Sequence, residues 1–504
     1  MELTLSKRQR NITLAVVFTI AGVVYCLISL VNHYLFKTYA LDLGLYTHAM
    51  FDYAHFRVDD CSMFKVSPQS ILSDHFDLYL IILSPLIHVF GSYTLLIVQI
   101  TGILLGGWGV YKLIGLYTDD DWLPILALAT FCFSFGIIQA LAFDYHSNVL
   151  AAMMLPWLLY FFKKSRFALA TLFVVLFVIG KENMSLWLVF IVIGLMWDYR
   201  KERKALWLLA AYAIFSVIYF FMINMVVMPR LGGSGGGFYR YEYLGSNYVE
   251  IAKNLIMHPK LTLRLLFTSP VPLEEFQGLN GRLYYLVSVT IASPNFAGIK
   301  EEFYCCALAT GLVFTLLKPN YLFMLIPLIG QKMIACQPNF WGVSYQYSVE
   351  FMPILIVSSF LVFIRLKKHL LRIILASCLL LSTIVTTIYT ADQPRSSRAV
   401  DQIRIYQGQH YEQKKFDVKY ARELIKQIPN DVSVSAASMF VPHLALREEI
   451  YDLDNRTNAD ADYVFITWPY FEKIKQDMHV FGNISDYEIV GTDSTIYLLK
   501  RVRP

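Results

Sequence analysis

The chain has 504 residues, of which 56% are hydrophobic and 16% charged, and its formal net charge is +5. Soluble domains are about 45–50% apolar and about 25% charged, so this composition excludes an ordinary soluble protein. The basic residues stand in short clusters between apolar runs. That pattern is typical of membrane topology and argues against a nucleic-acid-binding surface.

The first apolar run, Ile12–Tyr34, is long enough to cross a bilayer. Lys7, Arg8 and Arg10 precede it, so the N-terminus is expected in the cytoplasm and the polar loop at about 37–91 outside. Within that loop, Phe76–Phe90 is apolar but too short to span, and we expect an interfacial helix.

About eleven spans follow from this reading. The ten after the first are expected near 92–117, 122–142, 147–162, 167–180, 185–198, 205–228, 302–317, 321–336, 349–364 and 373–390. With this count, the basic clusters at 163–166, 200–204 and 365–372 all fall on the cytoplasmic side, as the positive-inside rule requires.

A second outer loop is expected at about 229–301, and residues 391–504 form a tail of different, more charged composition. In the tail, Phe416–Ile428 predicts an amphipathic helix, while Val432–Ala436, Tyr463–Thr467 and Thr495–Leu499 predict strands. The sequence therefore predicts a helical polytopic membrane domain, 1–390, followed by a small extracytoplasmic α/β domain, 391–504.

Ionisable and aromatic residues gather at the outer ends of the expected spans. They are Asp74 and His75 in the first loop, Asp144 and His146, Lys181 and Glu182, Arg240, and the run Tyr345-Gln346-Tyr347. Ionisable groups at membrane depth are costly and tend to mark function. Structural alternatives remain open: Lys181 and Glu182 as an ion pair at a helix end, Asp144 and His146 as helix caps, and the aromatic residues as an interfacial belt.

Asp42 differs from these residues because it lies in an apolar, helix-like context, Tyr39-Ala-Leu-Asp-Leu-Gly-Leu-Tyr. A lone carboxylate in such a context is costly, which favours a functional role. The cytoplasmic side offers basic clusters and Asp119–Asp121, but no mixture of acidic residues and histidine. The working face is therefore expected outside.

Several motifs resemble those of a bacterial domain-of-unknown-function family of predicted membrane proteins, which is itself similar to the GT-C superfamily of lipid-linked-sugar glycosyltransferases. The motifs are Asp-Leu-Gly-Leu at 42–45, Asp74-His75-Phe76 with Pro85, Phe143-Asp144-Tyr145-His146, Lys181-Glu182, Tyr347 with Pro353, Ser433-Val434-Ser435, and Pro442-His443-Leu444 with Arg447. The resemblance covers nearly the whole chain.

The resemblance implies a GT-C-like fold and places Asp42 where a catalytic carboxylate is expected. The donor would be a polyprenyl-phosphate-linked sugar, and the acceptor a lipid, glycan or protein at the outer face of a bacterial cytoplasmic membrane. Asp42 would remove the proton of the acceptor hydroxyl, and Lys181 and Arg240, with Arg57 behind them, would stabilise the phosphate leaving group. Asp74, His75, Asp144 and His146 would line the pocket or hold a divalent ion, and His443 belongs to the tail motif. No Asp-Asp or Asp-Glu pair is aligned with Asp42, which departs from the commoner GT-C pattern and leaves metal dependence open.

A flippase or transporter of lipid-linked glycans is the alternative. A flippase needs a polar path across the bilayer, whereas the mid-span positions are almost uniformly apolar. Discontinuous spans in matching halves, which are typical of transporters, are also not expected from the sequence.

Overall fold

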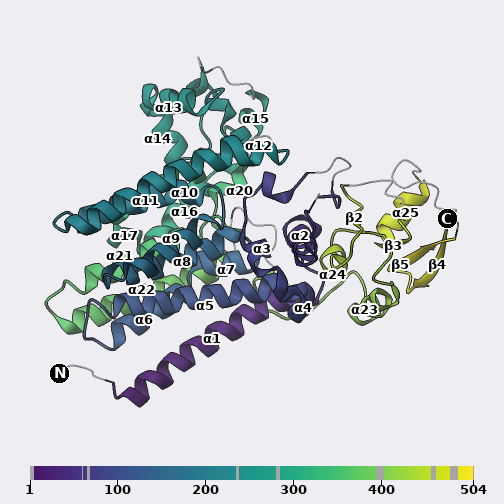
Figure 1. Ribbon diagram of the computed structural model, residues 1–504, viewed down its shortest axis with the longest axis horizontal. Helices are drawn as coiled ribbons and strands as arrows, with labels where there is room; N and C mark the ends of the chain where they lie inside the picture. Colours follow the sequence, from purple (N-terminus) through teal and green to yellow (C-terminus); the bar gives the residue numbers. More distant parts are fainter. Residues whose placement is uncertain are drawn as a thin grey trace.

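A computed structural model describes residues 5–59, 61–64, 69–233, 238–277, 279, 284–392, 395, 402–455, 461–476 and 486–502. Most of these residues are helical, and the helices lie side by side in a bundle (Figure 1). A small sheet domain lies beyond one end of the bundle, and α13, α14 and α15 form a separate group along one side of it. The two termini lie at opposite ends of the molecule.

The helices of the first half are α1 (Lys7–Tyr34), α2 (Leu45–Ala54), α3 (Tyr79–Leu83), α4 (Ile87–Phe90), α5 (Thr94–Ile114), α6 (Trp122–Cys132), α7 (Phe135–Leu141), α8 (Ser147–Lys163), α9 (Phe167–Val178) and α10 (Met184–Asp198). The second half contains α11 (Arg203–Met222), α12 (Met228–Arg230), α13 (Tyr248–Met257), α14 (Pro259–Phe267), α15 (Tyr284–Val289), α16 (Ile299–Ala307), α17 (Val313–Thr315), α18 (Pro319–Met324), α19 (Ile326–Ile334), α20 (Pro338–Trp341), α21 (Phe351–Phe363) and α22 (His369–Asp392).

Four helices are long and apolar enough to cross a membrane: Lys7–Tyr34, Tyr79–Ile114, Arg203–Arg230 and His369–Asp392. A fifth is counted if α6 and α7, which are bent by 42° at their junction, form one span, and α8, α9, α10 and α21 are shorter apolar helices. The prediction of a helical membrane protein is confirmed. All eleven expected segments are helical, but their number as spans stays a prediction.

Two of the expected spans are interrupted, which the sequence did not predict; whether the breaks lie in matching halves stays untested. Besides the bend between α6 and α7, the helix that begins with α16 breaks at Gly311, whose φ is +124°. A side chain at Gly311 would meet the Ser359 hydroxyl and the Leu355 carbonyl oxygen, so only glycine allows α21 to approach this closely. In the expected interfacial segment 76–90, helix begins only at Tyr79 and runs in short pieces, and Gly91 (φ +55°) lies between these and α5 within the candidate span Tyr79–Ile114. Its interfacial position stays a prediction.

Glycines also set the contact between α5 and α8. A Cβ atom at Gly102 would lie 2.4 Å from Leu150, and one at Gly106 would lie 2.5 Å from the Met153 sulfur. This spacing of small residues lets two helix backbones approach closely in an apolar environment, where packing rather than the hydrophobic effect holds helices together.

We expect Gly106→Leu to destabilise the protein by about 1–3 kcal/mol, because the larger side chain overpacks the α5–α8 contact. The thermal unfolding temperature of the purified protein in detergent measures this effect. Leu105→Phe is the matched control, since Leu105 is 53% exposed on the neighbouring position of the same helix. Equal unfolding temperatures for the two variants would contradict the packing argument.

The C-terminal domain is a five-stranded sheet of order β2-β1-β3-β5-β4. Its elements are α23 (Val418–Gln427), β1 (Val434–Ala436), α24 (Val441–Leu444), β2 (Ile450–Asp452), β3 (Tyr463–Thr467), α25 (Trp468–Gln476), β4 (Tyr487–Thr492) and β5 (Ile496–Arg501). Strand β1 pairs parallel with β2 and β3, whereas β5 pairs antiparallel with β3 and β4. The predicted small α/β domain is confirmed, while its three-residue β2 and its β4 were not expected.

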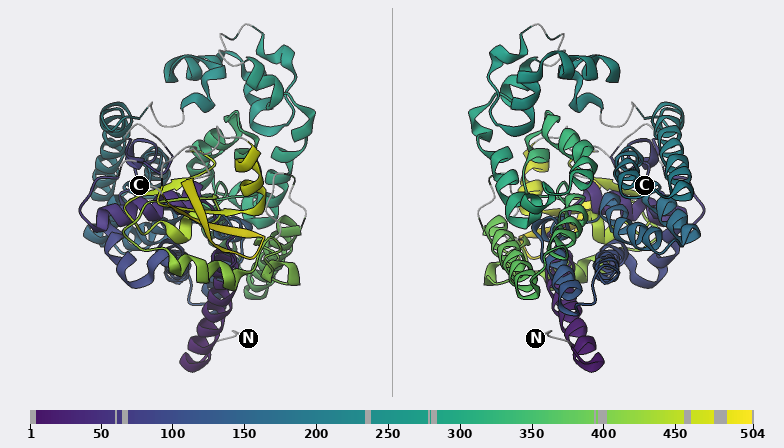
Figure 2. Two further views of the ribbon diagram at one scale, coloured as in Figure 1. Left: turned by 90° about the vertical axis from the view of Figure 1, so that its right-hand side faces the viewer. Right: turned by 90° about the vertical axis from the view of Figure 1, so that its left-hand side faces the viewer.

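The sheet domain lies across the ends of the helices, as Figure 2 shows in its left view. The segment before it binds the end of α1: the Asn32 amide donates to the Gln402 carbonyl oxygen (2.8 Å), and His410 Nε2 lies 2.8 Å from the Leu27 carbonyl oxygen. Arg422 of α23 donates to the Tyr34 carbonyl oxygen (3.0 Å). The tail is therefore fixed to the bundle, although the domain boundary at 390 itself stays a proposal.

Candidate functional site

The direction of each helix places the predicted site residues together at one end of the bundle. Helix α8 runs from just after His146 to Lys163, and α9 runs from just after Arg166 to just before Lys181. The acid–histidine motifs and the basic clusters therefore occupy opposite ends of the same helices. We call the end that carries Asp144 and Lys181 the polar end; the sheet domain covers it through α24, which packs on the turn Ala40–Gly44.

Asp42 lies in that turn in a rare backbone conformation, with φ 68° and ψ −91°. These angles are close to those of a positive-φ γ-turn, which is strained for a residue with a side chain. The surroundings hold the strain in place: the Ala40 amide donates to Ser438 (3.1 Å), and a Cβ at Gly44 would lie 3.0 Å from Val441. Strain of this kind clusters at functional sites, where it aims a side chain.

The Asp42 carboxylate faces His146, with 3.5 Å between Oδ1 and Nε2, and the two side chains are 21% and 4% exposed. Burial alone would raise the pKa of Asp42, but attraction to His146, with its hydrogen bond, and to His75 and Lys181 lowers it below the ordinary value. Burial and repulsion by Asp42 raise the pKa of Asp144 well above its usual range. The pKa values of the two carboxyl groups are thus shifted in opposite directions, so Asp42 is the one that ionises more readily.

The turn that carries Asp144 and His146 is held by a glutamine that the sequence did not point to. The Gln99 amide group donates to the Asp144 carbonyl oxygen (2.6 Å) and accepts from the His146 backbone amide (2.9 Å). Asp144 itself has φ +50°. The expected helix-cap role of His146 is not seen, because its side chain makes no capping hydrogen bond to α8.

His75, Lys181 and Glu182 form a second group at the polar end. The Lys181 ammonium lies 3.4 Å from His75 Nε2, and Glu182 lies 3.4 Å from His75 Nδ1. Glu182 also accepts from the Phe76 backbone amide (3.1 Å), which ties the α9–α10 turn to the first polar loop. Burial would raise the pKa of Glu182, but His75 and Lys181 lower it to about 2. Asp74 is exposed beside this group.

Between these two groups, Asp77 is 1% exposed. Its carboxyl group accepts from the Tyr79 backbone amide (2.9 Å) and the Tyr145 hydroxyl (3.2 Å). Burial is the largest effect and raises the pKa of Asp77 to about 7, although both hydrogen bonds and Lys181 oppose it. In the folded protein Asp77 therefore keeps its proton well above the pH at which an unfolded chain would lose it.

We expect Asp77→Asn to stabilise the protein at pH 8 and to change little at pH 4. The unfolded carboxyl titrates at 3.8 and the folded one near 7, so wild-type stability falls as the pH rises from about 4 to 7. Asparagine resembles the protonated acid and does not titrate, so the variant avoids this loss of stability. The loss amounts to about 1.4 kcal/mol of unfolding free energy for each unit by which folding shifts the pKa. The unfolding temperatures of wild type and Asp77→Asn from pH 4 to 8 measure this stability difference. A difference that stays constant with pH would contradict the raised pKa of Asp77.

An aromatic row continues from His146 along the polar end. His146 stacks on Phe143 (centroids 5.1 Å apart), Phe143 contacts Tyr345 edge-on (4.5 Å), and Tyr347 stacks on Phe340 (4.0 Å). The guanidinium of Arg240 lies 4.9 Å from the Phe340 centroid and donates to Gln337 (3.2 Å). Arg240 therefore lies at the end of the aromatic row opposite His146.

The loop with Tyr345-Gln346-Tyr347 is supported by a buried lysine that the sequence analysis missed. The Lys332 ammonium donates to the carbonyl oxygens of Gly342 (2.7 Å) and Tyr347 (3.2 Å). Glu350 next to the loop accepts from Asn148 (2.6 Å), and the buried side-chain oxygen of Gln346 has no hydrogen-bond partner among the described residues. Both Lys332 and Glu350 interrupt or border apolar runs, a signal that could have identified them.

Two predicted residues do not join the cluster. Arg57 pairs with Asp52 (3.1 Å) and Glu448 (3.0 Å) rather than with the group around Lys181, and its expected role behind Lys181 stays a prediction. His443 is buried in the contact between the domains, where it stacks on His33 (4.0 Å) and packs on Phe36. Burial and the neighbouring His33 and Arg422 keep the pKa of His443 well below its usual value, so it serves as a neutral packing residue.

The fit of a divalent ion can be tested on the same geometry. Among the residues that the structure describes, no three His, Cys, Asp or Glu side chains are grouped as metal ligands. His146 Nε2, the nitrogen nearest Asp42, already faces that carboxylate. The described residues of the polar end therefore lack the ligand grouping of a metal site.

A family model described as "Predicted membrane protein (DUF2079)" matches residues 32–279 and 281–491. The chain belongs to this family. The match includes every motif of the polar end, from Asp42 to Tyr347, and most of the sheet domain. The motif-based recognition of the family is confirmed.

Among solved structures, the chain is similar to ArnT from Cupriavidus metallidurans bound to undecaprenyl phosphate, with 10% identity, a TM-score of 0.48, and coverage of 96% of this chain and 97% of that one. The apo state of the same protein gives 10% identity, a TM-score of 0.46, and coverage of 95% and 97%. No curated protein matches the chain.

Proposed function

We propose that this protein is a membrane glycosyltransferase that moves a sugar from a polyprenyl-phosphate-linked donor to an acceptor hydroxyl, with Asp42 as the catalytic base. The observation that carries the proposal is the largely buried Asp42 carboxylate, whose pKa is lowered by attraction to His146 and Lys181 and which a strained turn aims into the cluster containing both. A carboxylate and a cation on the same polar end are what this transfer needs.

In the proposed reaction, the acceptor oxygen attacks the anomeric carbon of the donor sugar as the bond from that carbon to the phosphate oxygen breaks. The acceptor proton passes to Asp42, and polyprenyl phosphate leaves with the bonding electrons. Attack opposite the leaving group inverts the anomeric configuration. Because the acceptor hydroxyl becomes acidic only as its bond to carbon forms, a carboxylate of low pKa is a sufficient base late in this step.

The leaving phosphate gains negative charge, and the proposed stabilising group is Lys181. Its ammonium group lies at the turn between α9 and α10, with His75 3.4 Å away and Glu182 fixing the opposite side of the imidazole. This arrangement orients the cation before the substrate binds, which is the condition for strong electrostatic stabilisation of a transition state. Arg240, at the end of the aromatic row, would contact a more distant part of the donor.

The proposed setting is the cytoplasmic membrane of a bacterium, with the N-terminus in the cytoplasm and the polar end and sheet domain in the periplasm. The basic residues Lys163, Lys164 and Arg166, and those at 200–204 and 365–372, all follow or precede the helix ends opposite the polar end. That asymmetry agrees with the positive-inside rule. A lipid-linked donor would then present its head group at the level of Asp42, and the acceptor would be a lipid, glycan or protein outside.

A flippase of lipid-linked glycans is the second candidate, and one observation favours it. The helix breaks at Gly311 and between α6 and α7 are of the discontinuous kind that transporters use. However, the ionisable groups described above lie at the polar end rather than along the middle of the helices, where a translocated head group would need them.

The deciding experiment measures polyprenyl phosphate released by the purified protein in nanodiscs supplied with a panel of polyprenyl-phosphate sugars. Consumption of one donor, with transfer or hydrolysis of its sugar, supports the proposed function and identifies the sugar. Movement of an intact labelled lipid-linked glycan across a proteoliposome membrane, without donor consumption, would instead establish the flippase.

A further inference from the structure

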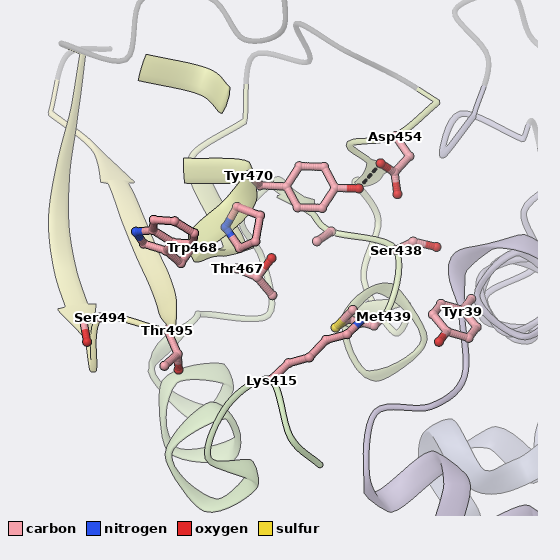
Figure 3. A pocket seen from close by; sticks show the side chains of 12 residues that line it. Tyr39, Lys415, Ser438, Met439, Asp454, Thr467, Trp468, Tyr470, Ser494 and Thr495 are labelled. Carbon is pink, nitrogen blue, oxygen red and sulfur yellow. Dashed lines mark hydrogen bonds between the residues drawn. The ribbon is translucent and has the colours of Figure 1, made fainter. Parts of the chain in front are cut away.

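The sheet domain contains a cavity of about 890 Å³ beside the Asp42 turn. Its lining comes from the segments that follow the three parallel strands: Ser438 and Met439 after β1, Asp454 after β2, and Trp468 and Tyr470 after β3. Figure 3 shows these side chains around the cavity, with Tyr39 of the membrane domain on one wall.

The position of the cavity follows from the topology of the sheet. The connection after β1 leads to β2 on one side, whereas the chain after β3 continues to β4 and β5 on the other side. Beyond the carboxyl ends of β1 and β3 these connections diverge, and such switch points are where open α/β sheets bind their ligands. A volume of 890 Å³ lies within the usual range of ligand pockets, about 300–1,000 Å³.

The chemistry of the lining favours a sugar chain over a lipid tail or a phosphate group. Trp468 and Tyr39 are 51% and 42% exposed and offer aromatic faces on which the apolar face of a pyranose ring can stack. Around them stand the hydroxyl groups of Ser438, Thr467, Ser494 and Thr495. Ser494 and Thr495 donate hydrogen bonds to Asp493, so their oxygens are available as acceptors. The Tyr470 hydroxyl is hydrogen-bonded to Asp454, which orients that carboxylate at the cavity wall.

Among the lining residues that the structure describes, charge is balanced, with one carboxylate, Asp454, and one ammonium group, Lys415. A phosphate or diphosphate site would need several cations or converging backbone amides, and a polyprenyl chain would need an apolar surface without these hydroxyls. Lys415 extends towards Met439 across the cavity in Figure 3, where it can donate to a sugar hydroxyl.

The cavity is coupled to the Asp42 turn through Tyr39 and Ser438. Tyr39 precedes Asp42 by three residues, so their Cα atoms are at most roughly 11 Å apart. Ser438, which lines the cavity, accepts the hydrogen bond from the Ala40 amide that helps to hold the turn. A sugar chain seated here would thus lie against the segment that leads into the Asp42 turn.

We propose that this cavity binds a glycan acceptor and presents its terminal hydroxyl to Asp42. This inference rests on the proposed function and adds to it that the acceptor is a saccharide, held by the sheet domain rather than by the membrane helices. Trp468 provides the stacking surface, Asp454 and Lys415 bind hydroxyl groups, and Tyr39 guides the chain towards the Asp42 turn.

The test is binding of the full-length protein in nanodiscs to an array of soluble oligosaccharides, including chitotriose, maltotriose, mannotriose and trigalacturonic acid. We expect at least one to bind, and Trp468→Ala, Asp454→Asn and Lys415→Ala each to weaken its binding by about tenfold. Lys414→Ala and Asp431→Asn are matched controls, because these residues lie in the same domain outside the cavity lining, and their affinities should equal that of wild type.

Failure to bind any array member, or equal binding by the cavity variants and the controls, would overturn the inference while leaving donor consumption as evidence for the proposed function. Saccharide binding that depends on Trp468 in a protein that consumes no donor would support the cavity and overturn the transferase. A variant that is misfolded is recognised by its lowered unfolding temperature, and Trp468→Phe, which keeps an aromatic face, should then retain most of the affinity.

Discussion

Asp42→Asn is expected to lower the rate of sugar transfer by about 10²–10⁴-fold, the usual contribution of a general base. Asparagine has nearly the same shape and can keep a contact with His146, which lies 3.5 Å from Asp42 in wild type. It cannot accept a proton from the acceptor. The measurement is the single-turnover rate of polyprenyl phosphate release with saturating donor, which separates chemistry from binding.

Glu448→Gln serves as the control for Asp42→Asn. Glu448 is an acidic residue of the sheet domain whose side chain is 75% exposed, and its contact with Arg57 is outside the Asp42 cluster. This variant should react at the wild-type rate. If Asp42→Asn also reacts at that rate while its unfolding temperature is unchanged, Asp42 is not the base and the mechanism proposed above is wrong.

Lys181→Ala is expected to slow the same step by about 10²–10³-fold, because a preorganised cation next to the leaving phosphate is lost. The effect should be smaller with a donor linked through a diphosphate, since that leaving group needs less stabilisation. Lys181→Arg should restore part of the rate. Comparing the two donors with each variant measures the leaving-group contribution directly.

A purely structural Lys181 gives a different result. If Lys181 only pairs with Glu182 at the helix end, Lys181→Ala lowers the unfolding temperature and slows transfer from the monophosphate and diphosphate donors by the same factor. Lys181→Arg then restores both rates to the same extent. Lys253→Ala is the control, because Lys253 is an exposed lysine of α13 and should affect neither rate nor stability.

The sequence was most informative where an ionisable residue stands in or beside an apolar run. Asp42, His146, Lys181 and Glu182 were identified in this way, and the structure brings them to one end of the bundle. The physical reason is that burying a charge at membrane depth is costly, so such residues are rare and noticeable.

The same reasoning could not identify residues whose role depends on contacts between distant segments. Gln99 is a neutral residue in the middle of an apolar run, and only the fold shows that it holds the turn with Asp144. Arg57 looked like a free cation beside the site, but Asp52 and Glu448 neutralise it. Local pattern does not specify pairings of this kind.

Secondary structure shows a similar limit. The amphipathic pattern predicted α23, and the runs Val432–Ala436 and Tyr463–Thr467 predicted β1 and β3. Strand β2, Ile450–Asp452, has three residues and lies in no longer apolar or β-branched run, so no sequence pattern marked it. The break at Gly311 depends on its contact with Ser359, 48 residues later.

The hydrogen bond between Ala40 and Ser438 joins residues 398 positions apart. During synthesis, the turn with Asp42 therefore leaves the ribosome long before its supports at Ser438 and Val441. A nascent chain can insert its first apolar helices before this turn is held in its strained conformation. Any fragment that ends before Ser438 lacks both supports.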